Sequence, residues 1–331
     1  MTQNLLSVQD LEISFRTAAG EVQVVRDLSF ELAQGEVLGI VGESGCGKSI
    51  TALSLLGLVP NPPGRVSKGR ILLEGEDIVT ASERRLRQIR GNDISMVFQE
   101  PMTSLNPVYS VGEQIAETAR AHFNSSRSEA WERAIEMLQL VGIPSPERRA
   151  HEFPHQLSGG MRQRVMIAIA LVCEPKVLIA DEPTTALDVT VQAQIFDLFR
   201  DLQHKIGAAI ILITHDIGVV AQMTDRVIVM YAGRKIEEGP VSAFITDPRH
   251  PYTRGLVNCI PRLSLDPSDD PEPLFEIPGV VPSPSDLSLP RCAFAPRCHN
   301  AFALCLEKSP PLLPVAEGRA AACWLETEKP G

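Results

Sequence analysis

Apolar and polar positions repeat with two different periods along the first 260 residues. Alternation with a period of two predicts strands, and apolar residues spaced by three or four predict helices. The predicted strands lie at 11–15, 22–30, 37–41, 70–73, 94–98, 177–180, 209–213, 227–231 and 235–237. The predicted helices lie at 50–58, 83–90, 112–142, 159–173, 191–206 and 216–223. Strands that alternate with helices indicate an α/β fold with a mainly parallel sheet.

The pattern changes after residue 260. Eight prolines fall between Pro261 and Pro290, too many for a helix or a central strand. We expect this stretch to be a linker or an arm on the protein surface. The chain is therefore predicted to have two units. The first is 1–260, with a helical part at about 105–172, and the second is 261–331, with a proline-rich arm and a cysteine-rich end.

Composition narrows the classes of protein that fit. The 331 residues are typical of about two domains, and a hydrophobic content of 44% supports a sizeable core. The formal net charge of −10 disfavours a globally basic nucleic-acid binder. No apolar run approaches the roughly 18 residues of a membrane span, and the first residues do not resemble a secretory signal. We therefore expect a cytosolic protein, and its seven cysteines, an odd number, argue against a disulfide framework.

A glycine-rich segment between a predicted strand and a predicted helix fits the pattern G-x4-G-K-[ST]. Glycines allow backbone N–H groups to surround phosphate oxygens, and the N-terminus of the next helix adds a positive end. Lys48 is expected to reach the β- and γ-phosphates, and the Ser49 hydroxyl is expected to bind Mg²⁺. The alternative is a glycine-rich turn without a ligand. The candidate nucleotide-binding residues are Gly42, Glu43, Ser44, Gly45, Cys46, Gly47, Lys48, Ser49 and Ile50.

Two carboxylates follow the predicted strand at 177–180. Successive side chains of a strand point to opposite faces, so Asp181 and Glu182 can divide two tasks. We expect Asp181 to contribute to the Mg²⁺ site and Glu182 to orient or deprotonate the attacking water. His215 follows a neighbouring strand, at the edge where open α/β sheets bind ligands, and can donate to the γ-phosphate. The alternatives are two solvated acids and a structural histidine.

The order of these motifs resembles that of the nucleotide-binding domain of ATP-binding cassette (ABC) proteins, over about residues 5–260. Three further motifs add to the resemblance: Gln99, the sequence Leu-Ser-Gly-Gly-Met-Arg-Gln at 157–163, and the sequence Ala-Leu-Asp ending at Asp188. The resemblance implies an ABC-type P-loop fold. That fold has a RecA-like parallel sheet, an antiparallel β subdomain and an α-helical subdomain, followed here by a small cysteine-rich extension.

The resemblance also implies a role for each motif. Gln99 corresponds to a catalytic-site glutamine that binds Mg²⁺ and couples the site to the membrane part. Asp188 corresponds to the conserved aspartate of the family's D-loop, and His215 corresponds to its switch histidine. Phe15 occupies the position of an aromatic residue that stacks on adenine, where the family more often has tyrosine.

Ser158, Gly159 and Gly160 resemble the family's signature motif. They precede a predicted helix, whose N-terminal N–H groups form an anion site. In the family, two cassettes pair head to tail, and each signature closes the ATP site of its partner. The alternative is an ordinary serine N-cap followed by flexible glycines.

Three segments resemble the D-type ATP-binding subunits of dipeptide and oligopeptide permeases, namely 97–107, 157–165 and 250–253. This resemblance implies an ATPase that energises peptide import from the cytoplasmic face of the inner membrane. The implied partners are an F-type ATP-binding subunit, two transmembrane permease subunits and an extracytoplasmic peptide-binding protein, with no nucleic acid. We expect 101–107 to meet the permease, and the alternative is an ordinary surface loop. The alternative hypotheses for the function are an ATPase of an importer for nickel, opines or oligosaccharides, a non-transport cassette, or a metal-sensing regulatory subunit.

Four of the cysteines lie in a short segment with little core of its own, with the spacing Cys292-x5-Cys298-x6-Cys305-x17-Cys323. Four thiolates suit Zn²⁺ or an iron–sulfur cluster, although the spacing lacks the paired C-x2-C of common zinc sites. The resemblance to D-type subunits implies a 4Fe–4S cluster. Zn²⁺ and free thiols are the alternatives. A bound metal would stabilise an extension too small to fold alone.

Overall fold

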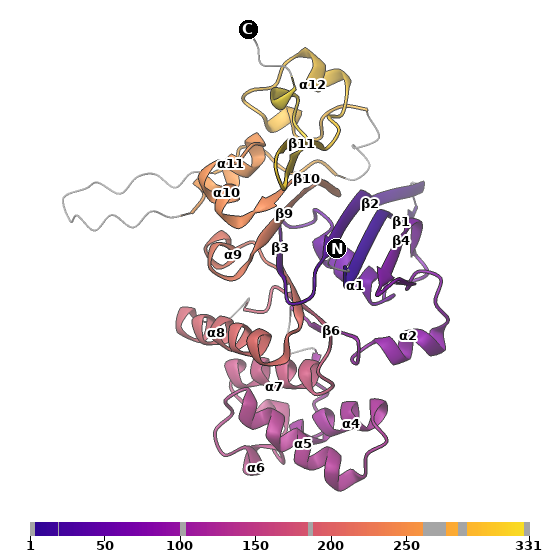
Figure 1. Cartoon of the computed structure of the whole chain (residues 1–331), viewed down its shortest axis with the longest axis vertical. Helices are drawn as coiled ribbons and strands as arrows, with labels where there is room; N and C mark the ends of the chain where they lie inside the picture. Colours follow the sequence, from indigo (N-terminus) through magenta and orange to yellow (C-terminus); the bar gives the residue numbers. More distant parts are fainter. Residues whose placement is uncertain are drawn as a thin grey trace, which may run out of the picture.

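The computed structural model describes residues 4–18, 20–99, 104–184, 188–260, 276–283 and 290–327. An eight-stranded sheet runs through the middle of the protein, and a four-stranded sheet lies beside it (Figure 1). A group of helices lies at one end of the molecule, and the last part of the chain lies at the opposite end. The predicted α/β organisation is confirmed for the described residues.

The larger sheet has the strand order β11-β12-β10-β9-β3-β8-β7-β6. Strands β6 to β9 and β3 form the parallel part, and β10, β12 and β11 continue the sheet with antiparallel pairing. Every residue of β3, β6, β7 and β8 is buried, as expected for parallel strands covered on both faces. The bounds are β3 Val37–Val41, β6 Ile94–Val97, β7 Val177–Asp181, β8 Ala209–Ile213, β9 Arg226–Tyr231, β10 Arg234–Pro240, β11 Leu313–Ala316 and β12 Arg319–Ala321.

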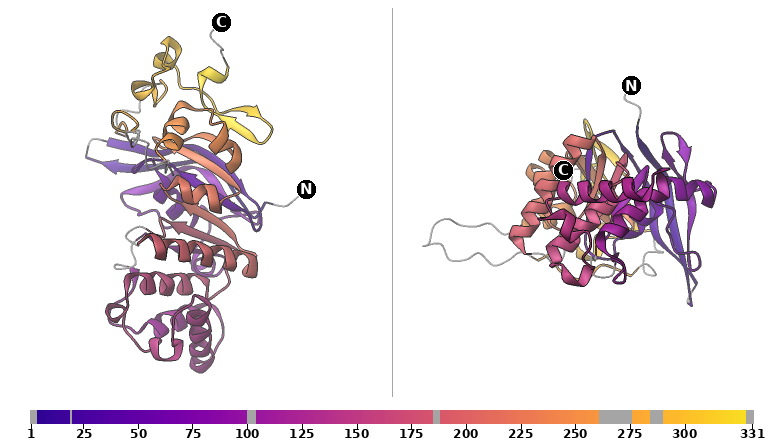
Figure 2. Two further views of the ribbon diagram at one scale, coloured as in Figure 1. Left: turned by 90° about the vertical axis from the view of Figure 1, so that its left-hand side faces the viewer. Right: turned by 90° about the horizontal axis from the view of Figure 1, so that it is seen from below.

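The smaller sheet is antiparallel and has the order β2-β1-β4-β5 (Figure 2). Its bounds are β1 Leu6–Thr17, β2 Gly20–Leu32, β4 Gly64–Leu73 and β5 Glu76–Asp77. One face packs on the larger sheet, because Leu11, Ile13 and Leu28 belong to the same buried cluster as Leu38 and Ile40 of β3. The alternation of apolar and polar residues at 22–30 is typical of a sheet that is buried on one face and exposed to solvent on the other.

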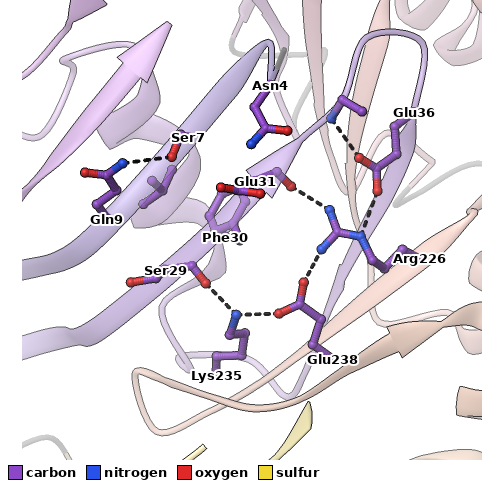
Figure 3. A pocket seen from close by; sticks show the side chains of 12 residues that line it. Asn4, Ser7, Gln9, Ser29, Phe30, Glu31, Glu36, Arg226, Lys235 and Glu238 are labelled. Carbon is purple, nitrogen blue, oxygen red and sulfur yellow. Dashed lines mark hydrogen bonds and ion pairs between the residues drawn. The ribbon is translucent and has the colours of Figure 1, made fainter. Parts of the chain in front are cut away.

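Charged side chains tie the two sheets together beside a pocket of about 540 Å³ (Figure 3). Arg226 of β9 donates to Glu36 over 2.8 Å and to the carbonyl of Glu31, and it also pairs with Glu238. Lys235 of β10 donates to the carbonyl of Ser29 in β2 and pairs with Glu238. The cations of this pocket are therefore bound to groups of the protein itself.

Helices cover the parallel strands and form the helical end of the molecule (Figure 1). Their bounds are α1 Lys48–Leu55, α2 Glu83–Ile89, α4 Val111–His122, α5 Arg127–Leu140, α6 Pro146–Arg149, α7 Gly159–Leu171, α8 Val189–Ile206, α9 Ile217–Met223, α10 Val241–Thr246, α11 Pro251–Asn258 and α12 Ala303–Glu307. Helices α4, α5 and α7 share one buried cluster with the strands β6 to β8. No helix in these described ranges is both long enough and apolar enough to cross a lipid bilayer.

The helical pattern predicted over 112–142 is confirmed, but it corresponds to two helices, because α4 ends at His122 and α5 begins at Arg127. Ser126 accepts a hydrogen bond from the N–H of Glu129, and the Glu129 side chain accepts one from the N–H of Ser126. This reciprocal capping box starts a new helix in the middle of a continuous helical pattern.

The proline-rich stretch predicted at 261–290 lies outside the described residues, except for 276–283 and Pro290. The chain beyond it adds β12 and β11 to the edge of the larger sheet. The last part of the chain thus pairs directly with β10.

Candidate nucleotide-binding site

The glycine-rich loop connects the end of β3 to the start of α1. Gly42, Gly45 and Gly47 have φ angles of 151°, 78° and 101°, a region that other residues avoid. A Cβ atom at Gly42 would lie 2.2 Å from the carbonyl oxygen of Met230. Gly47 is the N-cap of α1, so the free N–H groups at the start of this helix lie next to the loop.

Lys48 is buried and folds back over the loop that precedes it. Its Nζ donates to the carbonyl of Gly42 over 2.8 Å and to the carbonyl of Glu43 over 3.1 Å. The loop thus combines backbone N–H groups with a fixed ammonium charge, a combination that suits the phosphates of a nucleotide.

Asp181 ends β7 and is buried, and its carboxylate lies near the Ser49 hydroxyl. Burial raises the pKa of Asp181, while the Ser49 hydroxyl and the charge of Lys48 act in the opposite direction. Its Oδ1 atom has no hydrogen-bond partner among the described residues, although nearly all buried polar atoms in proteins have one. A buried carboxylate oxygen beside a serine hydroxyl provides the oxygen ligands that Mg²⁺ prefers. These residues therefore fit an Mg²⁺ site.

Glu182 lies next to Asp181 and has a φ of 46°, a strained conformation for glutamate. Its backbone N–H donates to the carbonyl of Ile213 over 2.8 Å, which ties the turn to β8. Gln99 Nε2 donates to Glu182 Oε2 over 2.8 Å, and His215 Nδ1 lies 3.3 Å from Glu182 Oε1. The structure thus brings together three side chains that were predicted to share one site, each from the end of a different strand.

Phe15 lies in β1, with its ring against the backbone of β4. A Cβ atom at Gly64 would lie 2.8 Å from the Phe15 ring. Phe15 is half-buried and packs against the cluster that includes Ile40 and Leu55. The close approach of the ring requires glycine at position 64.

The serine and glycines of the predicted signature motif form the start of α7. Ser158 caps this helix by accepting from the N–H of Met161 over 3.3 Å. Ser158 and Gly159 are exposed, and a Cβ atom at Gly160 would lie 2.8 Å from the Val191 side chain. Asp188 likewise caps α8.

The predicted signature residues and Asp188 make no polar contact with the glycine-rich loop among the described residues of the chain. Within the described ranges, no hydrogen bond or ion pair links Ser158, Gly159, Gly160 or Asp188 to residues 42–49. Of the predicted Ala-Leu-Asp motif, only Asp188 lies within the described residues. The start of α7 is thus an exposed helix N-terminus with no such contact to the glycine-rich loop among the described residues.

Sequence reasoning missed two residues that contact the loop from the last third of the chain. Tyr252 Oη accepts from the N–H of Glu43 over 2.8 Å. Arg297 makes a bidentate ion pair with the Glu43 carboxylate, with Nη1 2.6 Å from Oε2 and Nη2 2.9 Å from Oε1. Tyr252 lies in the segment that was singled out at 250–253, whereas the sequence holds no signal for Arg297.

The four clustered cysteines line one small cavity between the last turns of the chain. Burial raises the pKa of Cys292, of Cys298 and of Cys323, the last to about 11. All are free thiols, and the described part of the chain holds no group of three or more His, Cys, Asp or Glu side chains arranged to bind a metal. The structure therefore gives no support to the predicted iron–sulfur or zinc site.

Comparison with known proteins places this site in a family. Residues 25–185 match the model of the ABC transporter family, and residues 236–305 match that of the oligopeptide/dipeptide transporter C-terminal region. The chain is 52% identical over 323 residues to the oligopeptide transport ATP-binding protein OppD of Bacillus subtilis, covering 97% of this chain and 88% of OppD. It is 48% identical over 329 residues to the dipeptide transport ATP-binding protein DppD of the same organism, covering 99% and 96%.

The fold is also similar to that of a solved ATP-binding cassette. The dimeric post-hydrolysis structure of the ATP-binding cassette MJ0796, bound to ADP and Pi, superposes with a TM-score of 0.65 at 26% identity, covering 71% of this chain and 98% of that one. By its fold and its site, the protein is a P-loop ATPase of the ABC class. Within that class, the chain belongs to the family of ATP-binding proteins of oligopeptide and dipeptide transporters.

Proposed function

We propose that the protein hydrolyses ATP at this site and thereby energises the import of dipeptides or oligopeptides through a membrane permease. The observation that carries the proposal is the convergence of Gln99, Glu182 and His215 next to Asp181. Peptide as the cargo is supported by the names of the two relatives and by the match over 236–305.

The proposed binding residues act on the phosphates and on the metal. The N–H groups of residues 42–50, together with Lys48, bind the phosphate oxygens. Ser49, Asp181 and Gln99 hold Mg²⁺. When it is bound, Mg²⁺ neutralises the charge that develops on the phosphates. Phe15 presents its aromatic face to the adenine ring.

Glu182 and His215 are the proposed catalytic side chains. Glu182 accepts a proton from the attacking water, a role typically worth about 10²–10⁴-fold in rate. Gln99 donates to the same carboxylate and fixes its orientation. His215, whose side chain is 65% exposed, is accessible to the γ-phosphate and donates to it in our proposal.

The proposed partners are an F-type ATP-binding subunit, two transmembrane permease subunits and, indirectly, an extracytoplasmic peptide-binding protein. Pairing of cassettes is supported by the exposed N-terminus of α7, which makes no hydrogen bond or ion pair to residues 42–49 among the described residues. We propose that Ser158, Gly159, Gly160 and Asp188 complete the ATP site of the F-type subunit. ATP binding then closes the pair, and hydrolysis opens it.

We further propose that the protein lies at the cytoplasmic face of the inner membrane as a peripheral subunit. Val108 and Tyr109 support a permease contact near 101–107, because these two hydrophobic residues are 72% and 51% exposed. Of the 101–107 segment, 104–107 lies within the described residues.

The proposed division of the chain is a nucleotide-binding domain at 1–260, with a helical subdomain at about 105–172, and a C-terminal extension at 261–331. The shared buried cluster of α4, α5 and α7 supports the helical subdomain. The separate family matches over 25–185 and 236–305 support two units.

A 4Fe–4S cluster at Cys292, Cys298, Cys305 and Cys323, or Zn²⁺ in its place, remains a proposal that rests on donor chemistry. Four thiols around one cavity are a sufficient ligand set for either metal. Anaerobic purification followed by metal analysis and visible spectroscopy tests it. Stoichiometric iron with inorganic sulfide supports the cluster, and metal-free protein with four titratable thiols excludes both metals.

Reconstitution tests the transport function. The chain is co-purified with its F-type partner and the two permease subunits and placed in liposomes with labelled peptide. We expect peptide uptake that requires ATP and is abolished by Lys48→Ala. Recovery of the chain with ribosomes or DNA in place of permease subunits would contradict the proposal.

A further inference from the structure

We infer that Arg297 is a positioning residue for nucleotide binding, because it fixes the glycine-rich loop through Glu43. The inference rests on the proposed function of that loop. Arg297 and Glu43 are 254 positions apart in the chain, and the contact joins the cysteine-rich segment to the start of the phosphate loop.

Arg297 uses all five of its N–H donors. Two of them form the paired bond to Glu43, with Nη1 at 2.6 Å from Oε2 and Nη2 at 2.9 Å from Oε1. The others donate to the carbonyls of Pro278 and Ile277 and to the Tyr231 hydroxyl, over 2.8, 3.2 and 3.4 Å. The side chain is only 4% exposed, and its hydrogen bond to Glu43 is the main cause that raises its pKa. A buried guanidinium with every donor satisfied has one well-defined orientation.

Every polar group of Glu43 has a partner as well. Its carboxylate binds Arg297, and its N–H donates to Tyr252 Oη over 2.8 Å. Its carbonyl accepts from Lys48 Nζ over 3.1 Å. Arg297 and Tyr252 therefore hold the residue whose carbonyl orients the lysine ammonium.

Three packed aromatic rings, those of Tyr231, Tyr252 and Phe294, surround the contact between Arg297 and Glu43. The ring centroid of Tyr231 lies 4.7 Å from that of Tyr252 and 5.3 Å from that of Phe294. The Arg297 guanidinium lies over the Tyr231 and Phe294 rings, at 5.8 and 5.9 Å from their centroids. Phe294, in the same turn as Arg297, thus packs against the helix that carries Tyr252.

The backbone of Arg297 belongs to the turns that carry two of the clustered cysteines. Ala295 N–H donates to the carbonyl of Cys292, and Cys298 N–H donates to the carbonyl of Ala295. A change in this segment therefore moves Arg297 and, through Glu43, the phosphate loop. The C-terminal segment is in this way part of the support of the nucleotide site.

The test compares Arg297→Ala with wild type in the full-length chain assembled with its partner subunits. We expect the Kd for Mg²⁺-ATP and the KM to rise about tenfold, with kcat changed less than about twofold, because a looser loop weakens ground-state and transition-state binding alike. Arg297→Lys keeps the charge but not the paired geometry, so it should restore only part of the affinity.

Two variants serve as controls. Arg319→Ala removes another arginine of the C-terminal part, bound to Asp247 over 3.0 Å, and should leave the Kd unchanged. Lys48→Ala should abolish tight ATP binding. If Lys48→Ala binds ATP normally, the proposed site fails; if only Arg297→Ala binds normally, the positioning role alone fails.

A double-mutant cycle with Glu43→Gln separates positioning from general support of the fold. If Arg297 acts through Glu43, the double variant should bind ATP no more weakly than the weaker single variant. Additive losses, or a lower melting temperature with unchanged Kd, would overturn the inference. Should Arg297→Ala fail to fold, Glu43→Gln tests the contact from the loop side, and an unchanged Kd would equally overturn it.

Discussion

Backbone geometry fixes the identity of Gly42. Its φ of 151° excludes ordinary side chains, and the carbonyl of Met230 occupies the place of a Cβ atom. The glycine at position 42 of the predicted strand–loop–helix motif is therefore required for a second reason besides phosphate binding. The loop passes so close to β9 that only glycine fits.

We predict that Gly42→Ala lowers the free energy of unfolding by more than about 3 kcal/mol, since the backbone must move to relieve the contact. Gly35→Ala is the matched control. Gly35 also has a positive φ, of 72°, but a Cβ atom there meets nothing within 4 Å, so only the strain of about 1–2 kcal/mol applies. Urea denaturation measures both, and equal losses would show that the Met230 contact is unimportant.

Residue types at a strand end placed Asp181 and Glu182 in one candidate site, but they did not predict the geometry of that site. The left-handed φ of Glu182 turns its carboxylate toward Gln99 and His215, and nothing in a sequence signals that conformation. Strain of this kind, worth about 1–3 kcal/mol, is typical of functional sites.

At the scale of elements, α11 has an unusual cap. His250 is fully buried, and its Nδ1 accepts from the N–H of Tyr252 over 3.0 Å. Burial, aided by the charge of Arg254, lowers the pKa of His250 to about 3. The neutral imidazole therefore caps the helix α11. Tyr252 of this helix contacts the glycine-rich loop.

We predict that this cap makes stability sensitive to acid. Because the pKa of His250 is about 3 when folded and about 6.5 when unfolded, only the unfolded chain binds this proton between those values. Stability should therefore fall as the pH drops below 6.5, with a slope from this group approaching about 1.4 kcal/mol per pH unit. Asn caps helices without titrating, so His250→Asn should reduce the slope between pH 6.5 and 5. Identical slopes in denaturation curves would exclude His250 as the cause.

Element predictions succeeded where one hydrophobic pattern coincided with one element. The buried runs at 37–41 and 209–213 are β3 and β8 as predicted. The helical pattern at 112–142 did not reveal the break between α4 and α5, because apolar positions with helical spacing lie on both sides of the capping box at Ser126. Strands β11 and β12, of four and three residues, are too short to give a pattern, and they form because β12 pairs with β10 and β11 pairs with β12.

At the scale of the whole molecule, the two helix N-termini that are proposed to bind phosphate lie in different parts of the protein. The glycine-rich loop lies by the sheets, whereas Ser158 lies at the start of α7 in the helical end of the molecule (Figure 1). That Ser158 serves the ATP site of a second cassette is what the sequence resemblance implies, and it stays a prediction. The contact between Arg297 and Glu43 was beyond sequence reasoning, because it depends on how the last strands join the sheet.

We predict that the isolated chain hydrolyses ATP slowly and that adding the F-type subunit raises turnover per cassette at least about tenfold, because in the proposed pair each signature supplies phosphate-binding groups to the other site. Ser158→Asp is the matched variant. Asp retains the helix cap of α7 but places a negative charge toward the partner's phosphates, so stability should hold while the stimulation is lost. Stimulation that survives Ser158→Asp would contradict head-to-tail pairing.

Single-turnover hydrolysis by Glu182→Gln, measured beside Mg²⁺-ATP binding in the assembled complex, tests the mechanism most directly. The glutamine keeps the size of the side chain and its contact with Gln99 but cannot accept the proton of the attacking water. We expect a Kd within about twofold of wild type and hydrolysis at least about 100-fold slower. Hydrolysis at the wild-type rate would show that the carboxylate of Glu182 is not the catalytic base.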